Sequence, residues 1–283
     1  MRFLSALIFF FSVAAHAADS RPLYTIFAGP AKGTYRQVAD DMAKACPAFN
    51  IQVQTTEGTL ANINSLIKPP PYISGNRIAF VQEDALSMVI GDVGKSSHIY
   101  KVISPMYSEE IMVIVNKKAG ILNVRDLAGK RVSIGTPGSG NWFTASLIKK
   151  KLGIKWYASE NSPPDAMLQV LTGQLDAAII VGGVPLEQFQ ELGKTMSDRV
   201  GIIPVNVSAL DKTYKMKRIP AKTYLWADYP VETKSTLSMM IAAHDVSDNA
   251  IKEFKSCLVK NLPAIQKFGH PKWQEISPLI RQK

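Results

Sequence analysis

The sequence predicts an α/β protein of two Rossmann-like lobes joined by a two-strand hinge. Three observations lead to this prediction. Short apolar strand patterns alternate with amphipathic helix patterns along residues 23–116. A second alternating run follows from residue 117. A long strand pattern at 235–244 and a helix pattern at 248–262 come last and have no third unit to join. They are therefore expected to return to the first unit, so that two strands cross between the lobes.

The first residues have the pattern of a secretory signal peptide, which we expect at residues 1–17. Arg2 gives a charged start, residues 3–15 are apolar apart from two serines, and Ala15-His16-Ala17 has the small-x-small form that signal peptidase reads. The apolar run is shorter than the roughly 20 residues of a transmembrane helix. The mature chain is expected to be soluble and exported to the periplasm.

The first unit alternates strands and helices in the order typical of parallel strands with helices on both faces. In its first helix, Tyr35, Val38 and Met42 recur at helical spacing. The prolines at 69–71 end its second helix. Strands are expected at 23–28, 51–55, 77–81, 101–106 and 110–116, and helices at 34–44, 60–67 and 84–90.

The second unit repeats this alternation. Strands are expected at 131–135, 177–181 and 199–205, and helices at 124–130, 142–152, 164–172 and 184–192. With the returning segment added, lobe 1 should comprise residues 18–115 plus 235–283, and lobe 2 residues 116–234. Ligands of open α/β sheets bind beyond the carboxyl ends of the strands, so the lobes should face each other across a cleft that the hinge can close.

The net charge and the two cysteines bear on the expected partners and on a disulfide. The net charge is +10, but the lysines are scattered and no basic-aromatic stripe is present, so we expect no nucleic-acid partner. Cys46 and Cys257 either pair or remain two separate buried thiols. We favour a disulfide, because free thiols are a liability in an oxidising compartment.

No catalytic or metal-binding signature is found. The histidines beyond the signal peptide, His98, His244 and His270, have no zinc-site spacing. Residues 91–96 resemble the end of a P-loop but lack its first glycine, and we expect a helix C-cap and turn there. Ser139 has Pro137 where a nucleophile elbow needs glycine. A protein without enzymatic activity, cofactor or metal is expected.

Two glycine loops, at 29–35 and 136–141, each join a strand to a helix. A helix N-terminus offers free N–H groups and a partial positive charge, which suit a carboxylate or a phosphate. The alternative is a pair of ordinary strand-to-helix turns with N-caps. Because one such loop opens each unit, we favour an anion site that both lobes share.

Several motifs occur in an order that resembles one known family. They are Gly33-Thr34-Tyr35, Phe80-Val81-Gln82 followed by Asp84, residues 126–132 (DLAGKRV), Pro137-Gly138-Ser139-Gly140, residues 173–177 (GQLDA), and Gly182-Gly183. This set resembles the TAXI-type solute receptors of TRAP transporters, which are type II-like periplasmic binding proteins. The resemblance covers nearly the whole mature sequence.

The resemblance implies a receptor that closes on a small organic acid or amino acid, glutamate-like or dicarboxylate, and presents it to the membrane subunits of a TRAP-type transporter. We expect a monomer. Carried over by position, the ligand shell comprises Gly33, Thr34, Tyr35, Gln82, Thr136, Gly138, Ser139, Asn141, Gly182 and Gly183. Lys32 either pairs a second carboxylate of the ligand or points into solvent.

The chain departs from the family pattern in the two loops that should touch the ligand. Pro30, Ala31 and Lys32 replace flexible positions of the first loop. Asn141, followed by bulky Trp142, stands where threonine is common. These departures bear on ligand identity and not on the fold.

Two other functions remain open from the sequence. A stand-alone sensor for a membrane signalling partner would use the same cleft. An exported enzyme on this fold is the least favoured, and it would draw acid–base groups from Glu83, Asp84, Glu109 and Glu110. Such carboxylates are more often helix-capping or solvated charges.

Overall fold

The structure, a computed structural model, describes residues 19–91 and 98–280. The predicted signal peptide and most of the turn expected at 91–96 lie outside the described residues. In the ranges described, no helix has both the length and the apolar character needed to cross a membrane.

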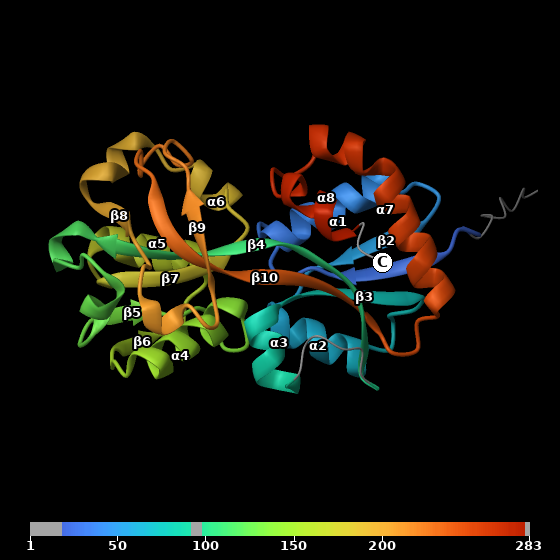
Figure 1. Ribbon diagram of the computed structural model, residues 1–283, viewed down its shortest axis with the longest axis horizontal. Helices are drawn as coiled ribbons and strands as arrows, with labels where there is room; N and C mark the ends of the chain where they lie inside the picture. Colours follow the sequence, from blue (N-terminus) through green and yellow to red (C-terminus); the bar gives the residue numbers. More distant parts are fainter. Residues whose placement is uncertain (1–18, 92–97, 281–283) are drawn as a thin grey trace, which may run out of the picture.

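The described residues fold into two α/β lobes that share one ten-stranded sheet (Figure 1). The strands are β1 (Leu23–Phe27), β2 (Asn50–Gln54), β3 (Asn76–Gln82), β4 (Tyr100–Asn116), β5 (Arg131–Ser133), β6 (Tyr157–Ser159), β7 (Ala177–Gly182), β8 (Val200–Ile203), β9 (Lys215–Ile219) and β10 (Val231–Ala243). The helices are α1 (Thr34–Ala45), α2 (Thr59–Ile67), α3 (Glu83–Ile90), α4 (Gly140–Leu152), α5 (Pro163–Thr172), α6 (Glu187–Gln190), α7 (Asp248–Phe268) and α8 (Trp273–Ile280).

The sheet is mixed, whereas the sequence analysis expected parallel strands. The strand order is β2-β1-β3-β10-β4-β7-β5-β6, with β8 also on β4 and β9 also on β10. β1 pairs parallel with β2 and β3, and β5 pairs parallel with β6 and β7. β4 and β10 run antiparallel to each other and to the strands beside them. The reason is that β10 brings the chain back from lobe 2 against the direction in which β4 left lobe 1.

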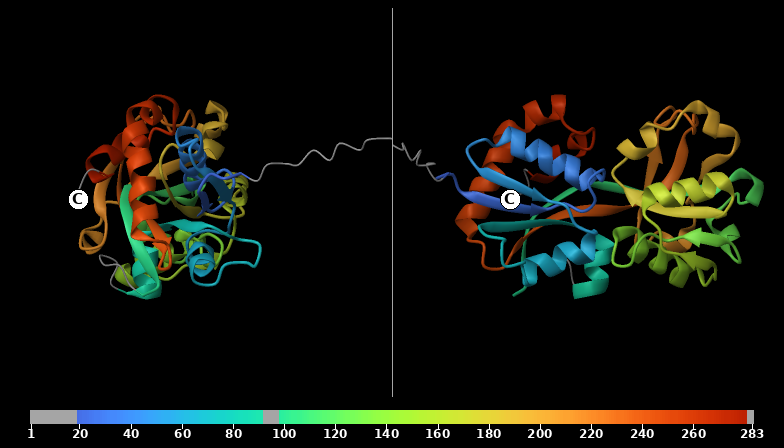
Figure 2. Two further views of the ribbon diagram at one scale, coloured as in Figure 1. Left: turned by 90° about the vertical axis from the view of Figure 1, so that its right-hand side faces the viewer. Right: turned by 180° about the vertical axis from the view of Figure 1, so that it is seen from behind.

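β4 and β10 form the hinge, and each is continuous through both lobes (Figures 1 and 2). The sequence analysis expected two strands, at 101–106 and 110–116, in place of β4. It read residues 107–109, between these two strands, as a short connection. In the structure Ser108 and Glu109 pair with Leu237 and Thr236 of β10. Both boundaries predicted for the lobes fall within these two strands, and the division at those residues stays a prediction.

Each lobe has its own apolar core. In lobe 1, α1, α7 and α8 cover one face of the sheet and α2 and α3 the other (Figure 1). In lobe 2, one buried cluster lies under α4 and a second under α5 and α6. Cys46, at the end of α1, is disulfide-bonded to Cys257 in α7, with 6.0 Å between their Cα atoms.

The other differences from the predicted elements are local. The helix expected at 124–130 is a short 3₁₀ turn, Val124–Leu127, and the helix expected at 184–192 is reduced to α6. The helix expected at 248–262 runs on through Pro263 to Phe268. The sequence analysis did not identify β6, β9 or α8.

Candidate functional site

A cavity of about 360 Å³ lies between the lobes. This volume is at the lower end of the range for small-molecule sites in proteins. Lobe 1 and the hinge line it with Ala28, Pro30, Lys32, Gly33, Thr34, Tyr35, Glu57, Gly58, Thr59, Gln82 and Glu109. Lobe 2 lines it with Thr136, Ser139, Gly140, Asn141, Ser162, Pro163, Pro164, Ile180, Val181, Gly182, Leu186 and Gln188.

Four helices begin on the wall of this cavity. The N-cap residues of α1, α2, α4 and α5 are Gly33, Gly58, Ser139 and Ser162, and all four line it. N-terminal N–H groups and helix dipoles make such a region electropositive without any cationic side chain. Pro163 begins α5 and has no N–H, so α1, α2 and α4 supply most of the donors.

The lobes touch each other around the cavity. The N–H of Leu60 in α2 donates to the carbonyl oxygen of Gly138 at 3.0 Å. The Thr34 hydroxyl in α1 donates to the carbonyl oxygen of Gly183 at 2.9 Å. Gly58 has φ of 118°, and a Cβ added there would lie 3.3 Å from Cα of Ser139. These contacts hold the first turns of α1 and α2 against lobe 2, so the structure is a closed form.

A buried polar network behind the wall joins the same two lobes. The Gln82 amide donates to the Thr144 hydroxyl at 3.1 Å, and that hydroxyl donates to Asp84 at 2.6 Å. Tyr214 donates to the same Asp84 oxygen at 2.8 Å, and Thr236 of the hinge donates to the other oxygen at 3.1 Å. Asp84, considered above as an acid–base group, therefore links α3 to α4 and β10 and does not line the cavity.

Two of the three charged residues on the wall are exposed. Lys32 forms an ion pair with Glu191 of lobe 2 at 3.4 Å, and both side chains are more than half exposed. This ion pair joins the two lobes at the surface, and the alternative that Lys32 pairs a second carboxylate of the ligand stays a prediction. Glu57, just before α2, is also exposed.

Glu109 is the acidic residue that is buried on the wall, with 3% of its surface exposed. The Tyr35 hydroxyl donates to its Oε2 at 2.9 Å. Burial raises the pKa of Glu109 to about 8, although the hydrogen bond from Tyr35 opposes this shift. Asp84 and Glu110 raise this pKa further and Lys272 lowers it. At neutral pH the carboxyl is therefore mostly protonated in the closed form.

Nine of the eleven predicted ligand residues line the cavity: Lys32, Gly33, Thr34, Tyr35, Gln82, Thr136, Ser139, Asn141 and Gly182. Gly138 and Gly183 do not, and both contact the opposite lobe through their carbonyl oxygens. Gly183 has no room for a side chain, since an added Cβ would lie 2.7 Å from the Thr34 methyl carbon. Whether the nine bind a ligand stays a prediction.

Asn141, the departure from the family pattern, has a structural role. Its Oδ1 accepts a hydrogen bond from the backbone N–H of Val181 at 2.8 Å, which fixes the end of β7 against the start of α4. Its NH₂ group stays available to donate a hydrogen bond into the cavity.

Sequence reasoning missed the contributions of α2, α5 and Glu109 to the wall. Gly58-Thr59 before an apolar helix pattern was an available signal for a further helix N-terminus. Ser162-Pro163 was the equivalent signal for α5. Glu109 was considered only as an acid–base group, because the sequence does not show that it is buried at the cavity. The described residues contain no group of three His, Cys, Asp or Glu side chains that could hold a metal ion.

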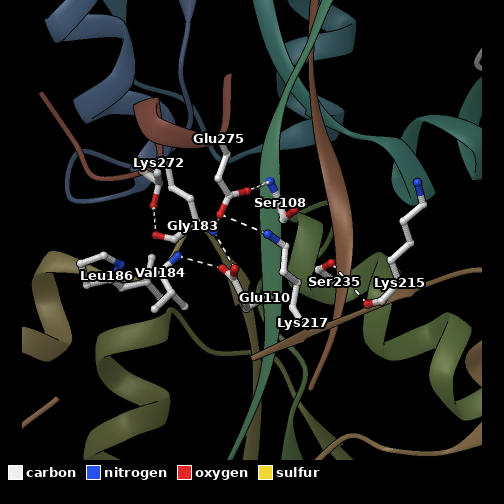
Figure 3. A network of polar contacts seen from close by, with 12 residues as sticks. Ser108, Glu110, Gly183, Val184, Leu186, Lys215, Lys217, Ser235, Lys272 and Glu275 are labelled. Carbon is white, nitrogen blue, oxygen red and sulfur yellow. Dashed lines mark hydrogen bonds and ion pairs between the residues drawn. The ribbon is translucent and has the colours of Figure 1, made fainter. Parts of the chain in front are cut away.

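A second polar network, centred on Lys272, lies where the hinge strand β4 meets α8 (Figure 3). The Lys272 ammonium contacts Glu110 of β4 at 2.5 Å and Glu275 of α8 at 2.8 Å. Glu110 also accepts from the Val184 N–H at 3.0 Å, and Glu275 from the Ser108 N–H at 2.9 Å. This network connects α8 to the loop after β7, and Leu186 of that loop lines the cavity.

A family model described as NMT1-like matches residues 26–280. The chain belongs to the NMT1-like family. Solved structures similar to this NMT1-like protein include a TctC solute-binding protein from Polaromonas, with 16% identity, a TM-score of 0.51 and coverage of 92% of this chain and 88% of that one. The periplasmic binding protein BugD has 15% identity, a TM-score of 0.57 and coverage of 91% and 86%.

A third similar structure is MatC from Rhodopseudomonas palustris with bound malate, with 12% identity, a TM-score of 0.56 and coverage of 87% and 85%. At these identities the likeness shows the fold alone. It confirms the predicted two-lobed α/β fold of the NMT1-like protein. The TAXI subtype stays a prediction.

Proposed function

We propose that the NMT1-like protein is a periplasmic solute receptor that captures a small organic acid or amino acid between its lobes and does not transform it. One observation carries this proposal: four helices from both lobes begin on the wall of one cavity. The predicted signal peptide supports export.

A carboxylate suits this wall for energetic reasons. Each hydrogen bond to a charged group contributes about 1.5–3 kcal/mol, and a partly buried helix N-terminus adds up to about 2 kcal/mol. Three or four such contacts are of the size needed for micromolar affinity, about −8 kcal/mol. Because the donors come from both lobes, the carboxylate would favour the closed form over the open one.

The cavity also has an apolar part. Ile180, Leu186 and the two prolines that begin α5 line it on the lobe 2 side. A ligand with a short aliphatic segment beside its carboxylate, such as a glutamate-like or dicarboxylate molecule, fits this combination. The malate bound in the similar MatC structure is of this chemical class.

The proposed partner is the membrane part of a TRAP-type transporter, to which the closed monomer would present its ligand. This part of the proposal is supported by the ordered motifs that resemble TAXI-type receptors. Uptake into proteoliposomes that contain candidate TRAP-type membrane subunits tests it. We expect uptake only when the NMT1-like protein is added. Equal uptake with and without this protein would contradict the proposal.

Thermal unfolding in the presence of small acids tests the binding proposal. The mature protein is freed of co-purified ligand by unfolding and refolding, then heated with organic acids, amino acids and their uncharged amides. A ligand at 100 times its Kd adds about 2.7 kcal/mol to the unfolding free energy, which raises Tm by about 5–11 °C. The amides should have little effect. The proposal fails if no acid raises Tm and native mass spectrometry finds none bound.

A further inference from the structure

Resting on the proposed function, we propose that the ligand is a zwitterion whose amine binds at Glu109 while its carboxylate lies at the helix N-termini. The ligand class is then an α-amino acid or a similar amino-carboxylic acid, and not a simple mono- or dicarboxylic acid. Glu109 becomes the residue that recognises the cationic end.

The position of Glu109 is the first observation behind this proposal. It is buried, it lines the cavity, and it comes from the hinge strand β4 and not from a helix N-terminus. In the part of the chain that the structure describes, Glu109 forms no ion pair with a lysine or arginine. Tyr35 donates to Oε2, and among the described residues no side chain or backbone group donates to Oε1. A buried carboxyl in this situation can gain a cationic partner only from the ligand.

Most of the charged groups that act on Glu109 are acidic. The ionisable groups that act on it are Tyr35 of α1, Asp84 of α3, Glu110 of its own strand and Lys272 before α8. Lys272, the one cation among them, is engaged by Glu110 and Glu275. A carboxylate brought to this end of the cavity would meet acidic groups, whereas an ammonium would be attracted.

Binding of an amine at Glu109 has a proton balance that can be measured. In the closed form without ligand, the raised pKa of Glu109, about 8, leaves its carboxyl mostly protonated at pH 7. An incoming ammonium favours the carboxylate, so the carboxyl proton passes to solvent while the ammonium keeps its own three. Complex formation at pH 7 should release nearly one proton, and affinity should rise up to tenfold per pH unit between pH 6 and 7.5.

Matched ligand pairs test this inference. Glutamate is compared with glutarate, and aspartate with succinate, by titration calorimetry at pH 7 in buffers of different ionisation enthalpy. We expect each amino acid that binds to do so at least tenfold more tightly than its partner without the amine, and to release nearly one proton. Glu109→Gln should remove both the preference and the proton release, whereas Glu160→Gln, at an exposed acid, should change neither. Melting of each variant checks that it folds.

The outcomes separate this inference from the proposed function. If acids without an amine bind at least as tightly as amino acids, with no proton release, the inference is wrong and the carboxylate receptor stands. That result would mean that protonated Glu109 donates to a second carboxylate of the ligand. If neither kind of acid binds, the proposed function itself fails. The comparison in the unmodified protein is decisive even if Glu109→Gln does not fold.

Discussion

The ion pair between Lys272 and Glu110 should be essential for stability, and Lys272→Met tests this. Both side chains are almost fully buried, with 4% and 5% of their surfaces exposed. Burial raises the pKa of Glu110 even though Lys272 opposes this shift. Without Lys272, a buried carboxylate would lose its cation, a change that costs about 3–5 kcal/mol in comparable pairs.

This magnitude converts into an observable shift. Each kcal/mol lowers Tm by about 2–4 °C in a protein of this size, so Lys272→Met should lower Tm by about 6–20 °C. Urea titration monitored by circular dichroism gives the loss of unfolding free energy directly. The double variant Lys272→Met, Glu110→Gln should recover part of that loss, because no uncompensated charge remains at Glu110.

The matched control is a surface ion pair near the hinge. Arg218 and Glu232 lie 3.5 Å apart on β9 and β10, and both are more than half exposed. Arg218→Met should therefore cost less than about 1 kcal/mol. The reasoning is refuted if Lys272→Met lowers the unfolding free energy no more than Arg218→Met does. It is also refuted if the loss in the double variant equals the sum of the losses in the two single variants.

Three further predictions follow from single features. Replacing Cys46 and Cys257 together by serine should lower the unfolding free energy by up to about 5 kcal/mol, since the bridge spans 211 positions, and an unchanged urea midpoint would contradict this. Gly140→Ala should weaken ligand binding at least tenfold, because its Cβ would lie 1.4 Å from the Gln82 Oε1, and calorimetry giving native affinity would refute it. Glu109 has a folded-state pKa of about 8 against an ordinary 4.5, so its contribution to stability is present below pH 4.5 and is lost as pH rises to 8. Glu109→Gln should flatten the fall in unfolding free energy over that range by up to about 1.4 kcal/mol per pH unit, and parallel curves for the two proteins would contradict this.

Elements with strong local patterns could be predicted from the sequence. The helix expected at 34–44 is α1, Thr34–Ala45, and the strand expected at 23–28 is β1, Leu23–Phe27. Spacing of apolar residues and glycine N-caps are local signals, so they predict an element without knowledge of its neighbours. The two glycine loops of the candidate site were found for the same reason.

Elements that depend on distant partners could not be predicted in this way. β9, Lys215–Ile219, is mostly charged and exposed, and it is a strand because it pairs with β10. The short connection expected at 107–109 lies in the middle of β4, where pairing with β10 makes it continuous strand. In both cases hydrogen bonds to a strand distant in the sequence override the local preference.

The sequence by itself determined the α/β class, the two units and a helix after each of the two glycine loops, because residues close together in the chain specify these features. Only the tertiary structure decided that α2 and α5 also begin on the cavity and that Glu109 is buried there between the lobes. A carboxylate has the same chemistry wherever it occurs in the chain, and its ionisation depends on the solvent and charges that folding places around it. The acidic end of the cavity, from which the preference for an amine was inferred, therefore comes from the assembly of lobe 1, lobe 2 and the hinge.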